Sequence, residues 1–165
     1  MFFERNVPRK FLIGQLIWFG LWVLGTGIGA FLLNPSAEGH GTHRQLGLPP
    51  CGSVVMFDRP CPGCGMTTSW THFIHGHFAE SFRPHPLGPI VYMLFTLTAL
   101  MCLYGYIRGQ RLITESKFAT RSLVAAILIF SGFGVVRFLT VTMNSQEHVV
   151  WQQTRAALEQ APTQR

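Results

Sequence analysis

The stretch LGPIVYMLFTLTALMCLYGYI, residues 87–107, has no charged side chain and is long enough to cross a bilayer as a helix. Two further stretches, 11–33 and 122–143, are similarly apolar, and Arg137 is the only charged residue in the latter. About 20 apolar residues are needed to span the hydrocarbon core. None of the three stretches alternates with a period of two, as a barrel strand would. The sequence therefore predicts an all-α membrane protein with three transmembrane helices.

The composition supports the same environment. Hydrophobic residues make up 48% of the 165-residue chain and charged residues only 12%, whereas about 25% of residues are charged in soluble domains. The net charge of +6 does not indicate nucleic-acid binding, because the basic residues gather beside the apolar stretches and form no stripe with interleaved aromatics. We expect one membrane domain over residues 1–165, with the lipid bilayer as its surroundings.

The positions of lysine and arginine predict the orientation. Cytoplasmic loops carry an excess of these residues, and here they gather before the first span and between the second and third. The N-terminus is therefore expected in the cytoplasm. The loop 34–86, called the cysteine loop below, and the tail 144–165 are expected to be extracytoplasmic. The basic residues are Arg5, Arg9 and Lys10 at the N-terminus and Arg108, Arg111, Lys117 and Arg121 in the link.

The first span, 11–33, resembles a signal peptide only in its position. A signal h-region has about 7 to 15 residues, so we expect a retained anchor. Gly25 and Gly29 form a small-xxx-small pair, which lets helix backbones approach closely in lipid. We favour packing within the three-helix bundle, and an oligomer through this Gly25/Gly29 face is the alternative.

The cysteine loop contains three of the four cysteines and six of the seven histidines. Its apolar patch, 54–57, is expected to form a short strand or a lipid-facing turn. After Gly65, apolar residues recur at helical spacing and predict an amphipathic interfacial helix. Gly76 suits the position just after its end. The expected apolar face is Met66, Trp70, Phe73 and Ile74, with Thr67, Thr68, Thr71, His72 and His75 on the other sides.

The run RPCPGCGMTT, residues 59–68, places Cys61 and Cys64 three positions apart where a loop is predicted to become a helix. One interpretation is structural. Disulfides are the usual role of cysteines outside the cytosol, and a bridge among Cys51, Cys61 and Cys64 would order the loop. The loop would then be a recognition or assembly element.

Metal binding is the second interpretation. Cys51, Cys61 and Cys64 with one histidine would complete the four soft ligands of a zinc site. His72 and His75 lie one helical turn apart and share a face, as two ligands would. His77 and His85 are further candidates for the fourth position.

Thiol–disulfide exchange by Cys61 and Cys64 is the third interpretation. The positive end of a helix dipole lowers a thiol pKa and favours the reactive thiolate. By position, Cys64 is expected to be the more stabilised sulfur. No strand of a βαβ unit precedes the motif, as one does in thioredoxin-like enzymes. We therefore expect no enzymatic activity and name no catalytic residue beyond this candidate pair.

Arg137 lies inside the third apolar stretch. It is expected either to extend its guanidinium to the outer interface or to reach beneath the cysteine loop and bind its carbonyls or a thiolate. Glu80 and Asp58 are candidate partners.

These residues carry a family resemblance. The motif Cys61-Pro-Gly-Cys64-Gly65-Met-Thr67, with Gly76 and Pro86-Leu87 downstream, resembles the bacterial membrane family catalogued as domain of unknown function 2752. The resemblance covers about residues 51–92. Thr68 stands where the family usually has arginine, and His85 where it usually has asparagine.

The resemblance implies a multi-pass protein of the bacterial inner membrane and brings no known reaction. Gly65, Thr67, Gly76, Pro86 and Arg137 are expected to have structural roles. We expect the Cys-Pro-Gly-Cys loop to be a structural recognition or assembly element for an envelope protein partner. The alternative is an envelope thiol–disulfide exchange or metal-binding protein that acts through Cys61 and Cys64, with zinc as the candidate ion.

Overall fold

The computed structural model describes residues 3–4, 8, 12–112 and 117–160. Three of its helices are long and apolar enough to cross a membrane: α1 (Ile13–Phe31), α5 (Gly88–Arg108) and α6 (Lys117–Thr140). The predicted all-α membrane fold with three spanning helices is confirmed. Arg5, Arg9 and Lys10, on which the expected orientation partly depends, lie outside the described residues.

The third helix differs most from its expected span of 122–143. It begins at Lys117 and ends at Thr140, so Lys117 and Arg121 belong to the helix rather than to the link. The helix can include these two basic residues because long basic side chains near a helix end extend to the membrane interface.

Helices α1 and α5 form an antiparallel pair joined by polar side chains at successive turns. Trp18 and Trp22 of α1 donate from Nε1 to the hydroxyls of Thr98 (3.4 Å) and Thr96 (3.1 Å) of α5. One turn further along α1, the hydroxyls of Thr26 and Tyr92 are 3.0 Å apart. Such hydrogen bonds join helices in lipid, where the hydrophobic effect does not drive the helices together.

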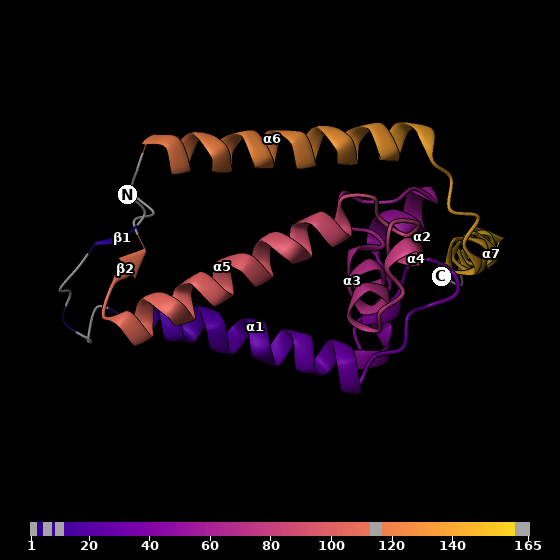
Figure 1. The fold of residues 1–165 in the computed structure, drawn as a ribbon. Coiled ribbons are helices and arrows are strands. Elements are labelled where there is room, and N and C mark those ends of the chain that lie inside the picture. Colours follow the sequence, from indigo (N-terminus) through magenta and orange to yellow (C-terminus); the bar gives the residue numbers. More distant parts are fainter. Residues whose placement is uncertain (1–2, 5–7, 9–11, 113–116, 161–165) are drawn as a thin grey trace, which may run out of the picture.

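Helix α3 (Met66–Ile74) lies between α1 and α5 where the two diverge (Figure 1). Trp70 Nε1 donates to the carbonyl of Gly88 at 2.9 Å. A Cβ at Gly29 would lie 2.7 Å from Ile74 Cδ1, whereas a Cβ at Gly25 would meet nothing within 4 Å. Gly29 is therefore used for packing inside the chain.

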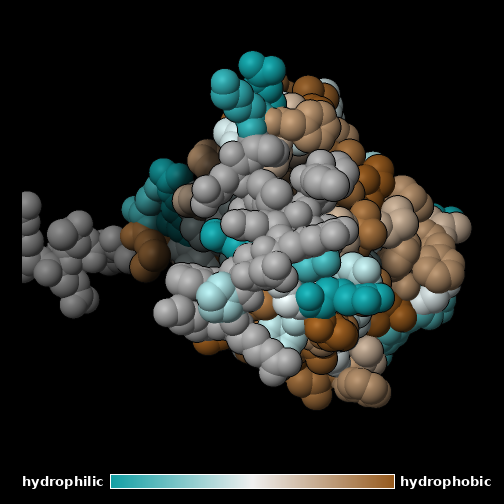
Figure 2. All heavy atoms as spheres, turned by 60° about the vertical axis from the view of Figure 1, so that its left-hand side comes forward, coloured by the Kyte–Doolittle hydropathy of each residue, from teal (hydrophilic) through white to brown (hydrophobic). Residues whose placement is uncertain are grey.

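Helix α6 runs apart from α1 and α5 in Figure 1. Every residue from Thr120 to Ile129 is exposed, and the helix meets the cysteine loop through its last turns. Gly134 packs on Pro62, and the ring of Phe133 meets that of His85 at a centroid distance of 5.4 Å. Hydrophobic residues, brown in Figure 2, gather on the right-hand side of that view.

The remaining elements are short and gather at the two ends of the three long helices (Figure 1). At one end, β1 (Phe3–Glu4) pairs antiparallel with β2 (Arg111–Leu112). At the other end lie η2 (Thr42–Leu46), α2 (Gly52–Phe57), α4 (Phe78–Ser81) and α7 (Gln146–Gln160).

The apolar patch 54–57 forms the end of α2, so the expectation of a strand or a lipid-facing turn is wrong. Cys51 precedes the helix in an extended conformation, and Asp58 ends it with a left-handed φ of 53°. Asp58 tolerates that conformation because its carboxylate accepts from the backbone N–H groups of Asn144 and Ser145 at 3.0 and 2.9 Å.

The buried face of α3 is polar, contrary to the amphipathic pattern. Thr68, Ser69 and Thr71 are at most 1% exposed. Their burial is tolerated because each hydroxyl has a partner. Thr68 meets the Thr42 hydroxyl at 2.8 Å, while Ser69 and Thr71 donate to the carbonyls of Ser81 and Thr67 at 2.6 and 2.8 Å.

Candidate functional site

Three cysteines converge in the cysteine loop. The Sγ atoms of Cys51, Cys61 and Cys64 all lie within 4.8 Å of one another, and each thiol is free. Cys51 stands just before α2, and the other two flank a turn in which the N–H of Cys64 donates to the carbonyl of Cys61 at 3.0 Å. Two short elements that are adjacent in the chain therefore deliver the three sulfurs to one place.

Gly65 makes the turn into α3 possible. Its φ of +83° is left-handed, and a Cβ there would lie 2.5 Å from the carbonyl oxygen of Pro84 and 3.0 Å from that of Gly39. Only glycine fits such a close backbone approach without strain. The chain can thus turn from Cys64 directly into the helix.

Two polar side chains hold this turn through its backbone carbonyls. Arg137 of α6 donates from Nη1 to the carbonyl of Cys64 (3.0 Å) and from Nη2 to that of Pro84 (3.1 Å). His85 is fully buried, and its Nε2 lies 3.0 Å from the carbonyl of Pro62. Because a carbonyl only accepts, Nε2 carries the proton, and burial lowers the pKa of His85 and keeps it neutral.

The expected carboxylate partners of Arg137 lie elsewhere. Glu80 Oε2 is 3.7 Å from Nδ1 of His72, and Asp58 binds the start of α7. The backbone carbonyls of Cys64 and Pro84 take their place as acceptors for Arg137. Neither Glu80 nor Asp58 is therefore the partner that the sequence suggested.

The cysteine cluster opens on a cavity of about 320 Å³. Cys51 and Cys61 are half-buried and Cys64 is buried. His40, Arg44 and Glu147 also line the cavity. The thiols thus border a partly open space large enough for an ion or a small group.

The two motif thiols differ in their electrostatics. A hydrogen bond from the Cys64 thiol is the main factor that lowers the pKa of Cys61, to about 5, while burial opposes the shift. The Cys51 thiol and the N–H groups of Gly63 and Cys64 also lower it. Donation of that hydrogen bond, together with burial, raises the pKa of Cys64. The expectation that Cys64 is the more stabilised thiolate is wrong, because the Cys64 thiol is itself the main donor to the sulfur of Cys61.

Residues 51–99 match the model of a family described as protein of unknown function, DUF2752. The resemblance found in the sequence is confirmed over this segment, which holds the three clustered cysteines, α3 and the first half of α5. The match covers less than half of the chain. No curated protein and no solved structure matches it.

Within the DUF2752 segment, the histidines proposed as zinc ligands do not join the cysteines. His72 lies beside His77 and Glu80, and burial lowers its pKa. His75 Nε2 is 3.2 Å from the carbonyl of Gly29 in α1. The cysteine cluster, as far as the described residues show, consists of three sulfurs without a histidine.

Other residues of the DUF2752 segment shape its backbone. Gly76 has a φ of +82° just after the end of α3. The carbonyl of Thr67 accepts from Thr71, and Thr67 also lines the cavity. Pro86 lies in the turn that leads into α5.

Cys102 follows the DUF2752 segment. It is buried within α5, away from the other thiols.

The sequence interpretation missed α7 and the residues around Glu147. Ser145 precedes the helix and accepts the N–H of His148 at 3.2 Å, and Glu147 lies in the first turn. Serine before a helix and an acidic residue in its first turn are signals of a helix start. These two signals predict the start of α7, but they do not predict its contact with the cysteine loop.

Proposed function

We propose that Cys51, Cys61 and Cys64 bind a soft metal ion of the zinc or copper(I) class. The convergence of three sulfur atoms within 4.8 Å at the wall of a cavity carries this proposal. A disulfide would employ two of these thiols and leave the third unused. Three thiolates are a ligand set that soft metals prefer, and the cavity leaves the next coordination position open.

The electrostatics of the cluster support metal binding. A cysteine binds metal as the thiolate. Cys61, with its pKa lowered to about 5, is a thiolate at neutral pH. Cys51 and Cys64 donate hydrogen bonds to it, so both sulfurs already point at the charge. Metal binding would release their two protons.

The membrane location and the orientation of the chain are part of this proposal. We assign the chain to a bacterial inner membrane, with the N-terminus in the cytoplasm and the cysteine loop and α7 outside. The basic residues support this orientation. The loop and α7 also lie at the same end of the three long helices (Figure 1), as three alternating spans require.

A role in recognition or assembly, which the sequence favours, is compatible with a metal site. A bound ion would order the loop and thereby present it to an envelope partner. The convergence of all three sulfurs at one place favours the metal over a single disulfide as the ordering element.

Metal content tests the proposal. Purified protein, reduced and then loaded with zinc or copper(I), should retain one ion per chain as measured by mass spectrometry of the metal. Cys51→Ser, Cys61→Ser and Cys64→Ser should each lose it, and Cys102→Ser is the matched control that should keep it. Full metal retention in Cys51→Ser would contradict the three-sulfur site.

Thiol–disulfide exchange is the second candidate, and the asymmetry of the two motif thiols favours it. The Cys61 thiolate would attack a partner disulfide, forming a mixed disulfide and releasing one partner thiolate. Cys64 would then lose its proton and attack Cys61, releasing the second thiolate. The partner gains two electrons, and Cys61 and Cys64 become a disulfide.

Trapping separates this candidate from metal binding. Exchange predicts that Cys64→Ser accumulates a mixed disulfide at Cys61, while Cys51→Ser continues to turn over. Alkylation of Cys61 by iodoacetamide should reach half its maximal rate near pH 5. Failure of Cys64→Ser to trap any partner, together with metal loss in Cys51→Ser, would leave metal binding as the function.

A further inference from the structure

We infer that Glu38, His40 and Glu147 form a second cation site, which takes a divalent ion of the zinc type and joins the cysteine loop to α7. The nearest nitrogen and oxygen atoms of the three side chains lie within 4.8 Å of one another. Its ligands are nitrogen and oxygen, so it does not depend on the thiols.

The orientation of His40 is the first observation. The residue is only 7% exposed, and its Nδ1 lies 3.1 Å from the backbone carbonyl of Glu38. A carbonyl only accepts, so Nδ1 carries a proton. Nε2 is buried without a hydrogen-bond partner, and it presents a lone pair to a metal ion once it carries no proton.

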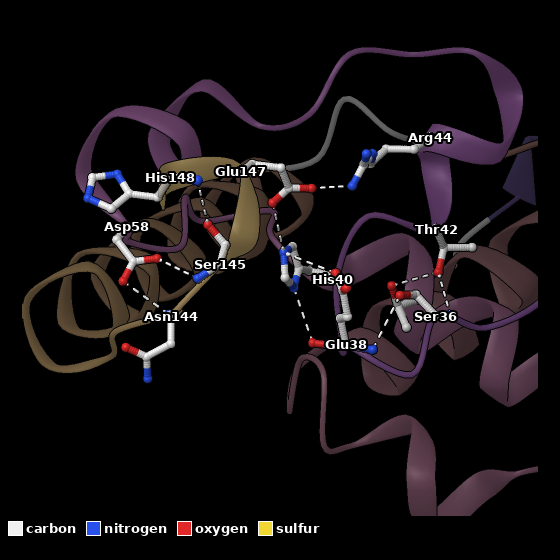
Figure 3. Close-up of polar contacts among 11 residues, drawn as sticks. Ser36, Glu38, His40, Thr42, Arg44, Asp58, Asn144, Ser145, Glu147 and His148 are labelled. Carbon is white, nitrogen blue, oxygen red and sulfur yellow. Dashed lines mark hydrogen bonds and ion pairs between the residues drawn. The ribbon is translucent and has the colours of Figure 1, made fainter. Parts of the chain in front are cut away.

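That lone pair faces two carboxylates (Figure 3). Nε2 of His40 is 3.7 Å from Oε2 of Glu147 and 4.0 Å from Oε2 of Glu38. A lone pair held against negative oxygens is unfavourable unless a cation lies between them. An N–H donated to a backbone carbonyl is also the arrangement that orients metal-binding histidines.

The distances are close to those that one ion needs. Zinc binds histidine nitrogen at about 2.0–2.1 Å and carboxylate oxygen at about 2.0–2.2 Å in a tetrahedron, so neighbouring ligand atoms lie roughly 3.3–3.5 Å apart. The two nitrogen–oxygen separations, 3.7 and 4.0 Å, are slightly longer. A small rotation of the Glu38 side chain, which is 63% exposed, would bring its oxygen into range.

Arg44 orients the Glu147 carboxylate. Its Nη1 binds Oε1 of Glu147, so Oε2 of the same carboxylate remains for the ion (Figure 3). Arg44 also cancels one of the two negative charges. The one negative charge that remains offsets half of the charge of a divalent cation, and the imidazole nitrogen supplies a further ligand.

The site would connect distant parts of the chain. Glu38 and His40 precede η2, whereas Glu147 lies in the first turn of α7. His40 and Glu147 also line the cavity onto which the cysteines open. An ion there would therefore hold α7 against the cavity and restrict access to the thiols.

Zinc titration after alkylation of all cysteines tests the inference, because it removes any thiolate site. Isothermal titration of the alkylated full chain with zinc should still show one site, and Glu38→Gln should weaken it by about tenfold or more. Glu159→Gln is the matched control. The Glu159 carboxylate lies in α7, as that of Glu147 does, and it is 65% exposed against 63% for Glu38. The zinc affinity of this variant should equal that of the wild type.

Hydrogen exchange supplies a second measurement. Zinc should slow exchange at the first-turn amides of α7 in alkylated wild-type protein but not in Glu38→Gln, whose fold is checked by gel filtration. Absence of zinc binding after alkylation, or equal affinity in Glu38→Gln, would overturn the inference. Protection that appears on acidification alone, without a response to zinc, would mean that a proton occupies the site and would overturn it as well.

Discussion

In the cysteine loop most of the fully buried side chains are polar, whereas α6 exposes apolar side chains along its whole middle section. His85, Thr42 and Thr68 are at most 1% exposed, while Ile127 and Leu128 are 55% and 67% exposed. Lipid solvates α6, so its apolar residues need no protein partner. The loop depends instead on hydrogen bonds and close backbone contacts. Single backbone and polar positions should therefore control stability more than any apolar residue in the middle of α6.

Gly65→Ala should have the largest effect. The added Cβ meets backbone atoms of Pro84 and requires a left-handed conformation, so we expect a loss above about 3 kcal/mol and little folded protein. The yield of monodisperse protein in detergent measures this. Gly63→Ala, in the same motif but with open space around it, should be neutral, and equal yields for the two variants would refute the comparison.

Arg137→Leu should come next. It removes two charge-assisted hydrogen bonds and leaves the carbonyls of Cys64 and Pro84 without these donors. We expect a loss of roughly 2–4 kcal/mol, measured as a shift of the unfolding midpoint in mixed micelles. Val136→Leu, an exposed neighbour on the same helix, is the control. An unchanged midpoint in Arg137→Leu would show that these two hydrogen bonds do not stabilise the fold.

Gly134→Ala sharpens the contrast within α6. A Cβ at Gly134 would lie 2.4 Å from Cβ of Pro62, whereas one at Gly132 meets nothing within 4 Å. We expect Gly134→Ala to cost about 1–3 kcal/mol and Gly132→Ala to cost nothing measurable in the same unfolding assay. A similar effect for both variants would argue against docking of α6 through Gly134.

Protonation of Asp58, at the edge of the cysteine loop, should have the smallest effect on stability. The N–H of Ser145 is the main factor that lowers the pKa of Asp58 below its ordinary value. Because the folded-state pKa is the lower one, the stabilisation is fully present above the ordinary value of 3.8 and is lost as the pH falls through the folded-state value. Trp151 fluorescence should report loosening of α7 only in that acidic range.

Asp58→Asn tests the same contact at neutral pH. The variant should show part of this loosening, because an amide oxygen is a weaker acceptor than a carboxylate. Glu80→Gln, whose carboxylate faces His72 rather than α7, should not change the fluorescence. A wild-type signal for Asp58→Asn at every pH would show that the carboxylate does not hold α7.

The comparison also explains what the sequence could predict. The three spans, and glycine just after α3, follow from length, composition and local conformation, all of which are present within one segment. The polar burial of Thr68 was not predictable, because it depends on Thr42, a residue outside the helix. The thiolate assignment failed for a similar reason, since the hydrogen bond from the Cys64 thiol to Cys61 is not visible in the spacing of the motif.

The guanidinium that holds the thiol turn arrives late in synthesis. Arg137 lies 73 residues after Cys64 in the chain, so the ribosome releases the cysteines well before the side chain that anchors their backbone. During that interval the nascent thiols lack their final geometry. Any oxidant, reductant or metal chaperone that acts on the mature arrangement must therefore work after the last helix has entered the bilayer.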